Sequence, residues 1–117
     1  MDELIAIDAL SALAQRTRIQ AFRHLVASFP GEIPAGDIAR HCGVPHNTMS
    51  SHLAALGRAG LVKSLRDGRT VRYRADMDGL RALVSFLARD CCEGRPDLCV
   101  PILAELAEPS CTPACGR

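Results

Sequence analysis

Two short helical segments on either side of Gly43-Val44-Pro45, followed by a hairpin signal, constrain this fold more than any other feature. The stretch from about Pro34 to Cys42 is typical of a short helix that stops at Gly43, and a second helix starts after Pro45. The β-prone runs LVKSL and TVRYRA then flank RDGR, whose Asp-Gly pair is a strong signal for a tight hairpin. The sequence therefore predicts a mostly α-helical fold with a small β-hairpin wing, a winged helix-turn-helix.

The helices on either side of this turn have amphipathic patterns. The helix after Pro45 is expected to point Met49, Leu53 and Leu56 inward, with Asn47 as a candidate N-cap. Upstream, QRTRIQAFRHLVASF predicts a helix that Thr17 caps and Pro30-Gly31 ends. Its expected apolar stripe consists of Ile19, Phe22, Leu25, Val26 and Phe29.

Two outer helices are predicted at about residues 4–14 and 79–92. Aliphatic side chains lie around much of the first, ELIAIDALSAL, which is too apolar for an ordinary surface helix. We therefore expect a second surface, such as a partner chain, to cover it. The composition changes after the last helix, so that residues 1–92 are expected to form one domain and residues 93–117 a cysteine-containing, partly flexible extension.

The charge is unevenly distributed although the whole chain carries only +1. Residues 1–37 hold three Arg against five acids, residues 40–74 hold seven Lys or Arg against one Asp, and residues 75–117 hold four Arg against seven acids. A basic centre between acidic flanks is typical of a module that binds a polyanion through its middle. A solvated, arginine-rich surface would give the same pattern, so charge alone does not decide between the two.

The N-terminal residues and the cysteines point to one cellular setting. Acidic residues stand where a signal peptide needs positive charge, and no apolar run approaches the ~18 residues that a membrane span requires. A cytoplasmic protein is therefore expected. In that reducing compartment the six cysteines favour metal or redox chemistry over a disulfide framework.

Two stretches carry a family resemblance. SSHLAALGRAGLV at residues 50–62 and RDGRTVRY at residues 66–73 are similar to the signature of the ArsR/SmtB group of metal-sensing winged-helix repressors. The resemblance spans about residues 4–92. It implies a five-helix, two-strand homodimer with the first and last helices at the interface, which binds double-stranded operator DNA at an inverted repeat.

The same resemblance implies a place for the inducer. The best-known site of the family is a Cys-x-Cys pair at the start of the first helix of the helix-turn-helix, where GDIARHC offers only Cys42, at its end. A subgroup of arsenic repressors instead has two adjacent cysteines at the end of the last helix and a third several residues on, and CCEGRPDLC resembles that arrangement. The implied ligands of As(III) are Cys91, Cys92 and Cys99, with Sb(III) as a second candidate and no organic cofactor.

The chemistry of three thiols agrees with this interpretation. Trivalent arsenic is soft and takes three thiolates in a pyramid, whereas structural zinc requires a fourth ligand. Cys91 and Cys92 converge on one atom only if the helix ends there, and the stretch before Cys99 is expected to form a short loop that returns the third thiol. Basic and acidic neighbours oppose each other in their effect on these thiols, and the sequence does not decide which prevails.

In a winged helix-turn-helix, the first turns of the second helix meet the base edges in the major groove. Asn pairs with adenine, Ser and Thr contact bases or phosphates, and a basic residue near the wing tip reaches the backbone. Asn47 or Thr48 acting only as a cap, or His52 being partly buried, is the structural alternative. The candidate DNA-binding residues are His46, Asn47, Thr48, Ser50, Ser51, His52 and Arg69.

Other functions stay open on the sequence alone. CTPACGR matches the C-x₅-R string of phosphatase-like arsenate reductases, but their loop needs a helix after it and this chain stops at Arg117, so no enzyme is expected. A redox switch would oxidise Cys91 or Cys92 and resolve with Cys99. Methylarsenite, antimonite or a soft divalent metal would be an alternative inducer. Cys42 is expected to pack in the core, whereas Cys111 and Cys115 either extend the thiol cluster, bind a second ion or have no role.

Overall fold

The computed structural model describes residues 1–91, 93 and 95–106, without the side chains of residues 90 and 91. The chain divides into two compact units, residues 1–83 and residues 84–117. The boundary falls inside one helix, α5 (Met77–Ser85). Among the helices that are described, none is both long and apolar enough to span a membrane.

Helix α1 (Glu3–Leu13) packs through its small residues. The carboxylate of Asp2 caps it by accepting a hydrogen bond from the amide of Ile5 at 2.9 Å. Ala6, Ala9 and Ala12 are buried, which lets the backbone approach α2 and α4 closely. The large aliphatic residues of the helix instead face outward; they are Leu4, Ile5, Ile7 and Leu10.

Helix α2 (Arg16–Ser28) confirms the predicted element but not its predicted cap. Gln15, not Thr17, is the N-cap, and its side-chain oxygen accepts a hydrogen bond from the amide of Arg18 at 2.8 Å. A glutamine is a rare cap, so the usual Ser/Thr signal placed the start two residues too late. Phe22 and Leu25 of the predicted stripe are buried, whereas Ile19 and Phe29 are exposed at its edges.

The predicted helix-turn-helix is confirmed as α3 (Ala35–Cys42) and α4 (His46–Arg58). Gly43 ends α3 in the left-handed conformation, with φ of 69°, which an L side chain adopts only with strain. Pro45 occupies the N-cap position of α4, so the expectation that Asn47 is the cap was wrong. Met49, Leu53 and Leu56 are fully buried, as their spacing predicts.

The hairpin is part of a three-stranded antiparallel sheet of order β1-β3-β2, with one strand more than expected. Strand β2 (Val62–Asp67) pairs with β3 (Thr70–Ala75), and β1 (Ile33–Pro34) pairs with the outer edge of β3. Asp67 opposes Thr70, so the loop pair is Gly68-Arg69 and not the predicted Asp-Gly. Gly68 has φ of 63°, as the first loop residue of a type II′ hairpin requires.

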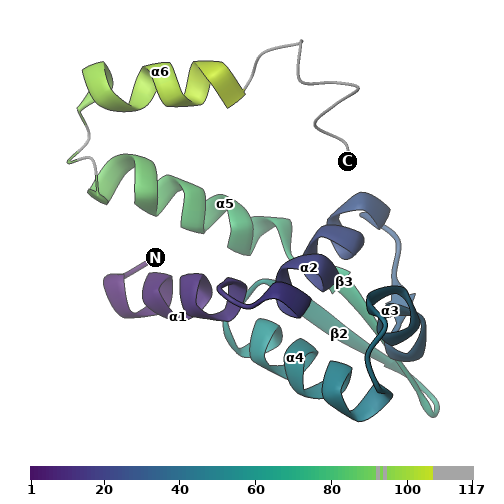
Figure 1. Cartoon of the computed structure of the whole chain (residues 1–117). Coiled ribbons are helices and arrows are strands. Elements are labelled where there is room, and N and C mark those ends of the chain that lie inside the picture. The colour runs from purple at the N-terminus through teal and green to yellow at the C-terminus, as the bar shows by residue number, and fades with distance from the viewer. Residues whose placement is uncertain (92, 94, 107–117) are drawn as a thin grey trace. The chain divides into compact units, whose positions relative to one another are not determined.

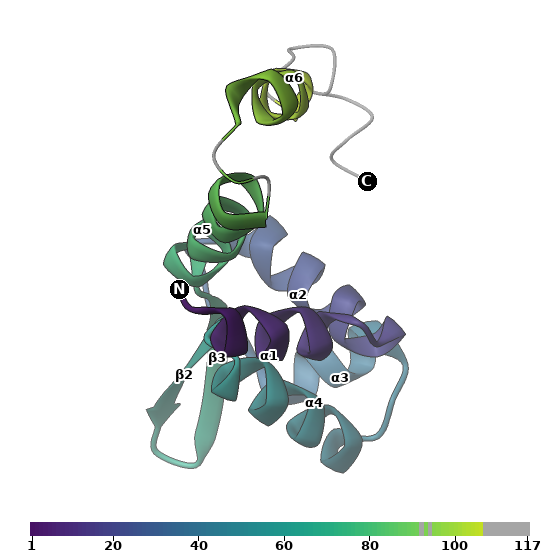
Figure 2. The same ribbon diagram turned by 90° about the vertical axis from the view of Figure 1, so that its left-hand side faces the viewer.

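In both views the tip of this hairpin and the first turn of α4 lie at the lower edge of the drawing (Figures 1 and 2). They therefore face the same side of the first unit. The sequence predicted both elements, and the packing of α4 against α3 and β2 places them together.

In the second unit, the chain after α5 continues as the π-helical segment η1 (Phe86–Cys91), and α6 (Pro96–Leu106) follows. Helix α6 is an element that the sequence analysis did not predict. It begins at Pro96, a residue that favours the first helical position, and contains Pro101 in its interior. The expected mobile tail falls on residues 107–117, which lie outside the described part of the chain.

Candidate functional site

The first two turns of α4 carry most of the predicted DNA-binding residues. Met49 and Leu53 anchor the inner face of the helix in the core. The opposite face therefore presents polar side chains outward. His46, Asn47, Thr48 and Ser51 are exposed, and Ser50 is half-buried. Because α4 begins at His46, Asn47 and Thr48 lie inside the first turn and not at the capping position.

A hollow of about 280 Å³ lies between α4, the start of α3 and the hairpin. Its lining includes His46 and Ser50 from α4 and Arg69 from the hairpin loop, three residues that the sequence placed in the same candidate site. Gly36 at the start of α3 forms another part of the wall, where a Cβ atom would come 3.7 Å from the His46 ring. The structure thus brings residues 46, 50 and 69 together around one concave surface.

The wing presents its basic side chains on both faces. Lys63 lies directly opposite Arg74, and Arg72 opposite Leu65, so these three basic residues share one face of the sheet. Arg66 lies on the other face, because side chains alternate along a strand. Arg69 in the loop is exposed and lies nearest to the tip.

His52 differs from the other predicted DNA-binding residues. It is half-buried, and its Nδ1 atom accepts a hydrogen bond from Nε of Arg18 on α2 at 3.1 Å. Burial, followed by the charge of Arg18, lowers the pKa of His52 below its ordinary value. One of its two nitrogens is therefore engaged within the protein, and only Nε2 is left for any contact with DNA.

Cys99 is the one residue of the predicted thiol cluster whose side chain the structure describes. It lies near the start of α6, is only 8% exposed, and donates a hydrogen bond from Sγ to the carbonyl oxygen of Ala88 in η1 at 2.6 Å. The expected loop before Cys99 is thus shorter than predicted, because α6 already begins at Pro96. An ion pair between Arg95 and Asp97, with N···O of 2.6 Å, lies on the exposed side of this turn.

The rest of the predicted cluster is not tested. Cys91 is the last residue of η1, but its side chain lies outside the described residues, as do Cys92, Cys111 and Cys115. Within the described residues there is no group of three or more His, Cys, Asp or Glu side chains that would hold a metal ion. The three-cysteine site therefore stays a prediction.

Comparison with known proteins agrees with this fold. A helix-turn-helix domain family matches residues 13–64. The HTH-type transcriptional regulator KmtR of Mycobacterium tuberculosis is 34% identical over 80 residues, which make up 68% of this chain and 59% of KmtR. The chain thus spans about three fifths of the length of this relative.

Two solved structures are similar over most of their length. An ArsR-like transcriptional regulator from Rhodococcus has a TM-score of 0.67 and 27% identity, covering 91% of this chain and 95% of the other. The winged helix-turn-helix domain of a possible ArsR-family regulator from Mycobacterium bovis, a homodimer, has a TM-score of 0.59 and 34% identity over 76% of this chain and 82% of that domain. This chain belongs to the ArsR family of transcriptional regulators. Members of this family are transcriptional regulators and not enzymes, as expected.

Cys42 is the only cysteine that this ArsR-family chain has in its helix-turn-helix. It is half-buried at the end of α3, and burial raises the pKa of its thiol. A thiol of raised pKa is mostly protonated at neutral pH and is then a poor nucleophile and a poor metal ligand. This environment agrees with the predicted packing role of Cys42.

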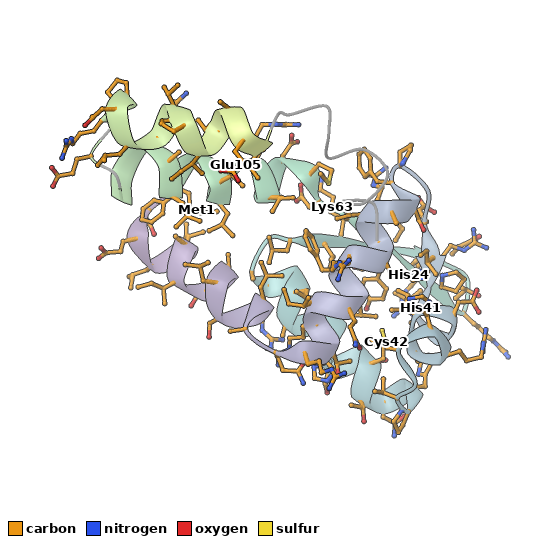
Figure 3. The ribbon with its side chains drawn as sticks, turned by 45° about the horizontal axis from the view of Figure 1, so that its top comes forward. Met1, His24, His41, Cys42, Lys63 and Glu105 are labelled. Atoms are coloured by element: carbon orange, nitrogen blue, oxygen red, sulfur yellow. The ribbon has the colours of Figure 1, made fainter. Side chains whose placement is uncertain are left out.

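Two histidines form a contact behind the helix-turn-helix of this ArsR-family chain that was not predicted from the sequence. The rings of His24 on α2 and His41 on α3 stack with centroids 3.7 Å apart and planes within 8°, beside Cys42 (Figure 3). Their nitrogen lone pairs lie in nearly parallel planes and so do not converge on one ion. The separation of the two residues in sequence left no local signal for this contact.

Proposed function

We propose that this chain is a transcriptional repressor that binds operator DNA through the first turns of α4 and the tip of the wing. The observation that carries this proposal is the hollow lined by His46, Ser50 and Arg69, next to the exposed Asn47 and Thr48. A helix N-terminus with short polar side chains meets base edges, and a basic loop beside it meets phosphates.

The charge distribution supports the same surface. The excess of positive charge lies within residues 40–74, which comprise the last turn of α3, all of α4 and nearly all of the hairpin. These elements form the side of the first unit that the α4 N-terminus and the wing tip face (Figure 1). Positive charge gathered there attracts a polyanion and releases its counterions on binding.

A homodimer is proposed as the binding unit. Leu4, Ile5, Ile7 and Leu10 of α1 are between 42% and 73% exposed, although the adjacent alanines pack tightly. An aliphatic face of this kind is stabilised when a second copy covers it, and the similar domain from Mycobacterium bovis is a homodimer. Twofold symmetry places two α4 helices on an inverted repeat, about 34–36 Å apart or a multiple of that distance.

As(III) bound by Cys91, Cys92 and Cys99 is proposed as the inducer. Arsenous acid and three thiols condense to three As–S bonds and three waters, so the thiol protons leave with the arsenic hydroxyls. Cys99 then has no proton to donate to the carbonyl of Ala88, and the contact between α6 and η1 is lost. We expect this change to reach the dimer and to separate the two α4 helices from their half-sites.

Coupling of this kind between two binding events typically amounts to about 1–3 kcal/mol, or a roughly 5- to 150-fold change in affinity. The test is a titration by fluorescence anisotropy on a duplex that the protein itself selects from randomised DNA. Arsenite, antimonite, methylarsenite, Cd²⁺, Pb²⁺, Zn²⁺ and peroxide are added in turn to the complex. Release by arsenite supports the proposal.

Other outcomes of this titration separate the alternatives. Release by peroxide without any metalloid would identify a thiol redox switch. Release by methylarsenite that survives Cys99→Ser would reduce the site to a pair of cysteines. Failure to select any DNA sequence would contradict the DNA-binding function itself.

A further inference from the structure

One hydrogen bond connects α2 directly to the DNA-reading helix. Nε of Arg18, in the first turn of α2, donates to Nδ1 of His52 in α4 over 3.1 Å. The two residues are 34 positions apart in the sequence, and the contact is partly buried. It holds α4 at its middle, one residue after the exposed Ser51 and one residue before the fully buried Leu53.

This bond exists in only one protonation state of the imidazole. A guanidinium nitrogen is always a donor, so Nδ1 must carry a free lone pair and the ring proton must reside on Nε2. Protonation of His52 places an N–H opposite an N–H and a second positive charge beside Arg18. The contact then changes from an attraction to a repulsion.

Among the described residues, no carboxylate forms an ion pair with His52 or with the Arg18 guanidinium. Arg18 lines a hollow of about 300 Å³ with Asp8 of α1 and Arg58 of α4 as the other charged residues. Arg58 adds positive charge to this region, and Asp8 is the one carboxylate that lines the hollow. The histidines on the elements behind α4, His24 and His41, are stacked on each other.

We propose that Arg18 is a positioning residue for DNA binding, which holds α4 through neutral His52, and that protonation of His52 releases this hold and weakens binding to DNA. This inference rests on the proposed DNA-binding function. The lowered pKa of His52, which burial and then Arg18 cause, supports it because the imidazole is neutral and the bond is formed at neutral pH. Below neutral pH, protonation of the half-buried His52 therefore weakens the contact that holds α4.

Three substitutions separate the bond from its titration. His52→Gln keeps a side-chain oxygen that accepts from Arg18 but does not titrate, whereas His52→Leu has no acceptor. Arg18→Ala removes the donor and leaves a titrating His52. Circular dichroism of each variant shows whether its helices are retained, and His46→Gln controls for the exposed histidine at the DNA surface.

DNA affinity is measured by anisotropy on the duplex selected by the wild-type protein. On going from about pH 7.5 to about pH 5.5, we expect the affinity of the wild-type chain to fall roughly tenfold, the scale of one lost charge-assisted hydrogen bond. His52→Gln should lose most of this pH dependence, whatever its affinity at the higher pH, because its side chain does not titrate in this range. Arg18→Ala should bind roughly tenfold more weakly already at the higher pH, and its affinity should change little on acidification.

A second measurement does not depend on DNA. The His52 ring protons, followed by NMR in the free protein, should titrate at a higher pH in Arg18→Ala than in the wild type. An unchanged midpoint would show that the two side chains do not interact and would overturn the inference whatever the DNA data. A shifted midpoint combined with wild-type DNA binding in Arg18→Ala would overturn the positioning role alone, and failure of all variants to bind any duplex would point to the proposed function instead.

Discussion

The thiol of Cys99 donates a hydrogen bond to the carbonyl oxygen of Ala88 at 2.6 Å, which joins α6 to the π-helical end of the preceding helix. The last four carbonyls of a helix lack donors within the helix, and the thiol supplies a donor to one of them at Ala88, the fourth residue from the end of η1. The same sulfur is the proposed third ligand of arsenic. Under this proposal, arsenic binding by Cys99 and this helix-to-helix contact exclude each other.

Cys99→Ser is expected to separate these two roles. The serine hydroxyl still donates to Ala88, so the variant should fold and bind DNA as the wild type does, but arsenite should no longer release it. Cys99→Ala loses the donor as well and should reduce the free energy of unfolding by about 0.5–1.5 kcal/mol. Chemical denaturation and arsenite titration of the DNA complex measure the two effects. If arsenite still released the Cys99→Ser variant fully from DNA, Cys99 would not be a ligand of arsenic.

The exposed aliphatic face of α1 predicts which substitution should prevent formation of the proposed dimer. Ile7 is 52% exposed in the single chain. Ile7→Glu should therefore leave the fold of the monomer intact, but it places a charge on the proposed interface and should disrupt association. Light scattering at micromolar concentration should then give the mass of one chain for the variant and of two chains for the wild type. A wild-type protein that is itself monomeric would contradict the proposed dimer.

The wing tip and helix α4 should contribute to DNA binding in different ways. Arg69→Ala is expected to weaken binding to all duplexes alike and to reduce the salt dependence by about one unit of slope, as the loss of one phosphate contact does. Asn47→Ala should change which sequences are preferred. Arg81→Ala, whose guanidinium pairs with Asp78 at 2.6 Å on α5, is the control and should change neither quantity.

The stacked histidines predict a loss of stability in mild acid. Burial, followed by the neighbouring His41, lowers the pKa of His24 below its ordinary value of 6.5. The unfolded chain thus takes up this proton at a higher pH than the folded chain, so the free energy of unfolding should decrease as the pH falls below 6.5. His24→Gln should remove part of that decrease in denaturation curves recorded across this range. His52, whose pKa is lowered in the same direction, should account for a further part.

Replacement of Gly79 by alanine should lower stability, contrary to the helix propensities of the two residues. A Cβ atom at this position in the first turn of α5 would overlap the carbonyl group of Gly60 in the turn after α4. Gly79→Ala should therefore lower stability by about 1–3 kcal/mol, although alanine is the better helix former. Thermal unfolding of the variant checks this, with Gly57→Ala as the comparison, because a Cβ there makes only ordinary contacts at 3.9 Å and beyond.

The resemblance carried by residues 50–62 and 66–73 anticipated the family, but it did not identify the ligand. One fold hosts many functions, so a resemblance in the helix-turn-helix and the wing does not identify the ligand. The predicted thiol cluster lies after them, and Cys99 is its one member whose side chain is described. The inducer is therefore a matter for titration.

The sequence by itself determined the features that local chemistry controls. Gly43 and Pro45 delimit the turn between α3 and α4, because Gly43 adopts a positive φ and Pro45 cannot continue a helix. The spacing of Met49, Leu53 and Leu56 set the buried face of α4, because helical periodicity places them on one side. The hairpin followed in the same way from a glycine between two β-prone runs.

Only the tertiary structure decided the features that depend on distant partners. The two-residue strand β1 has no pattern of its own and exists because Ile33 meets Tyr73. The alanines of α1, and not its large aliphatic residues, became the buried face because α2 and α4 approach closely on that side. Arg18 and His52 are 34 residues apart in the sequence, so no local interaction brings them together. Their hydrogen bond forms because α2 packs against α4.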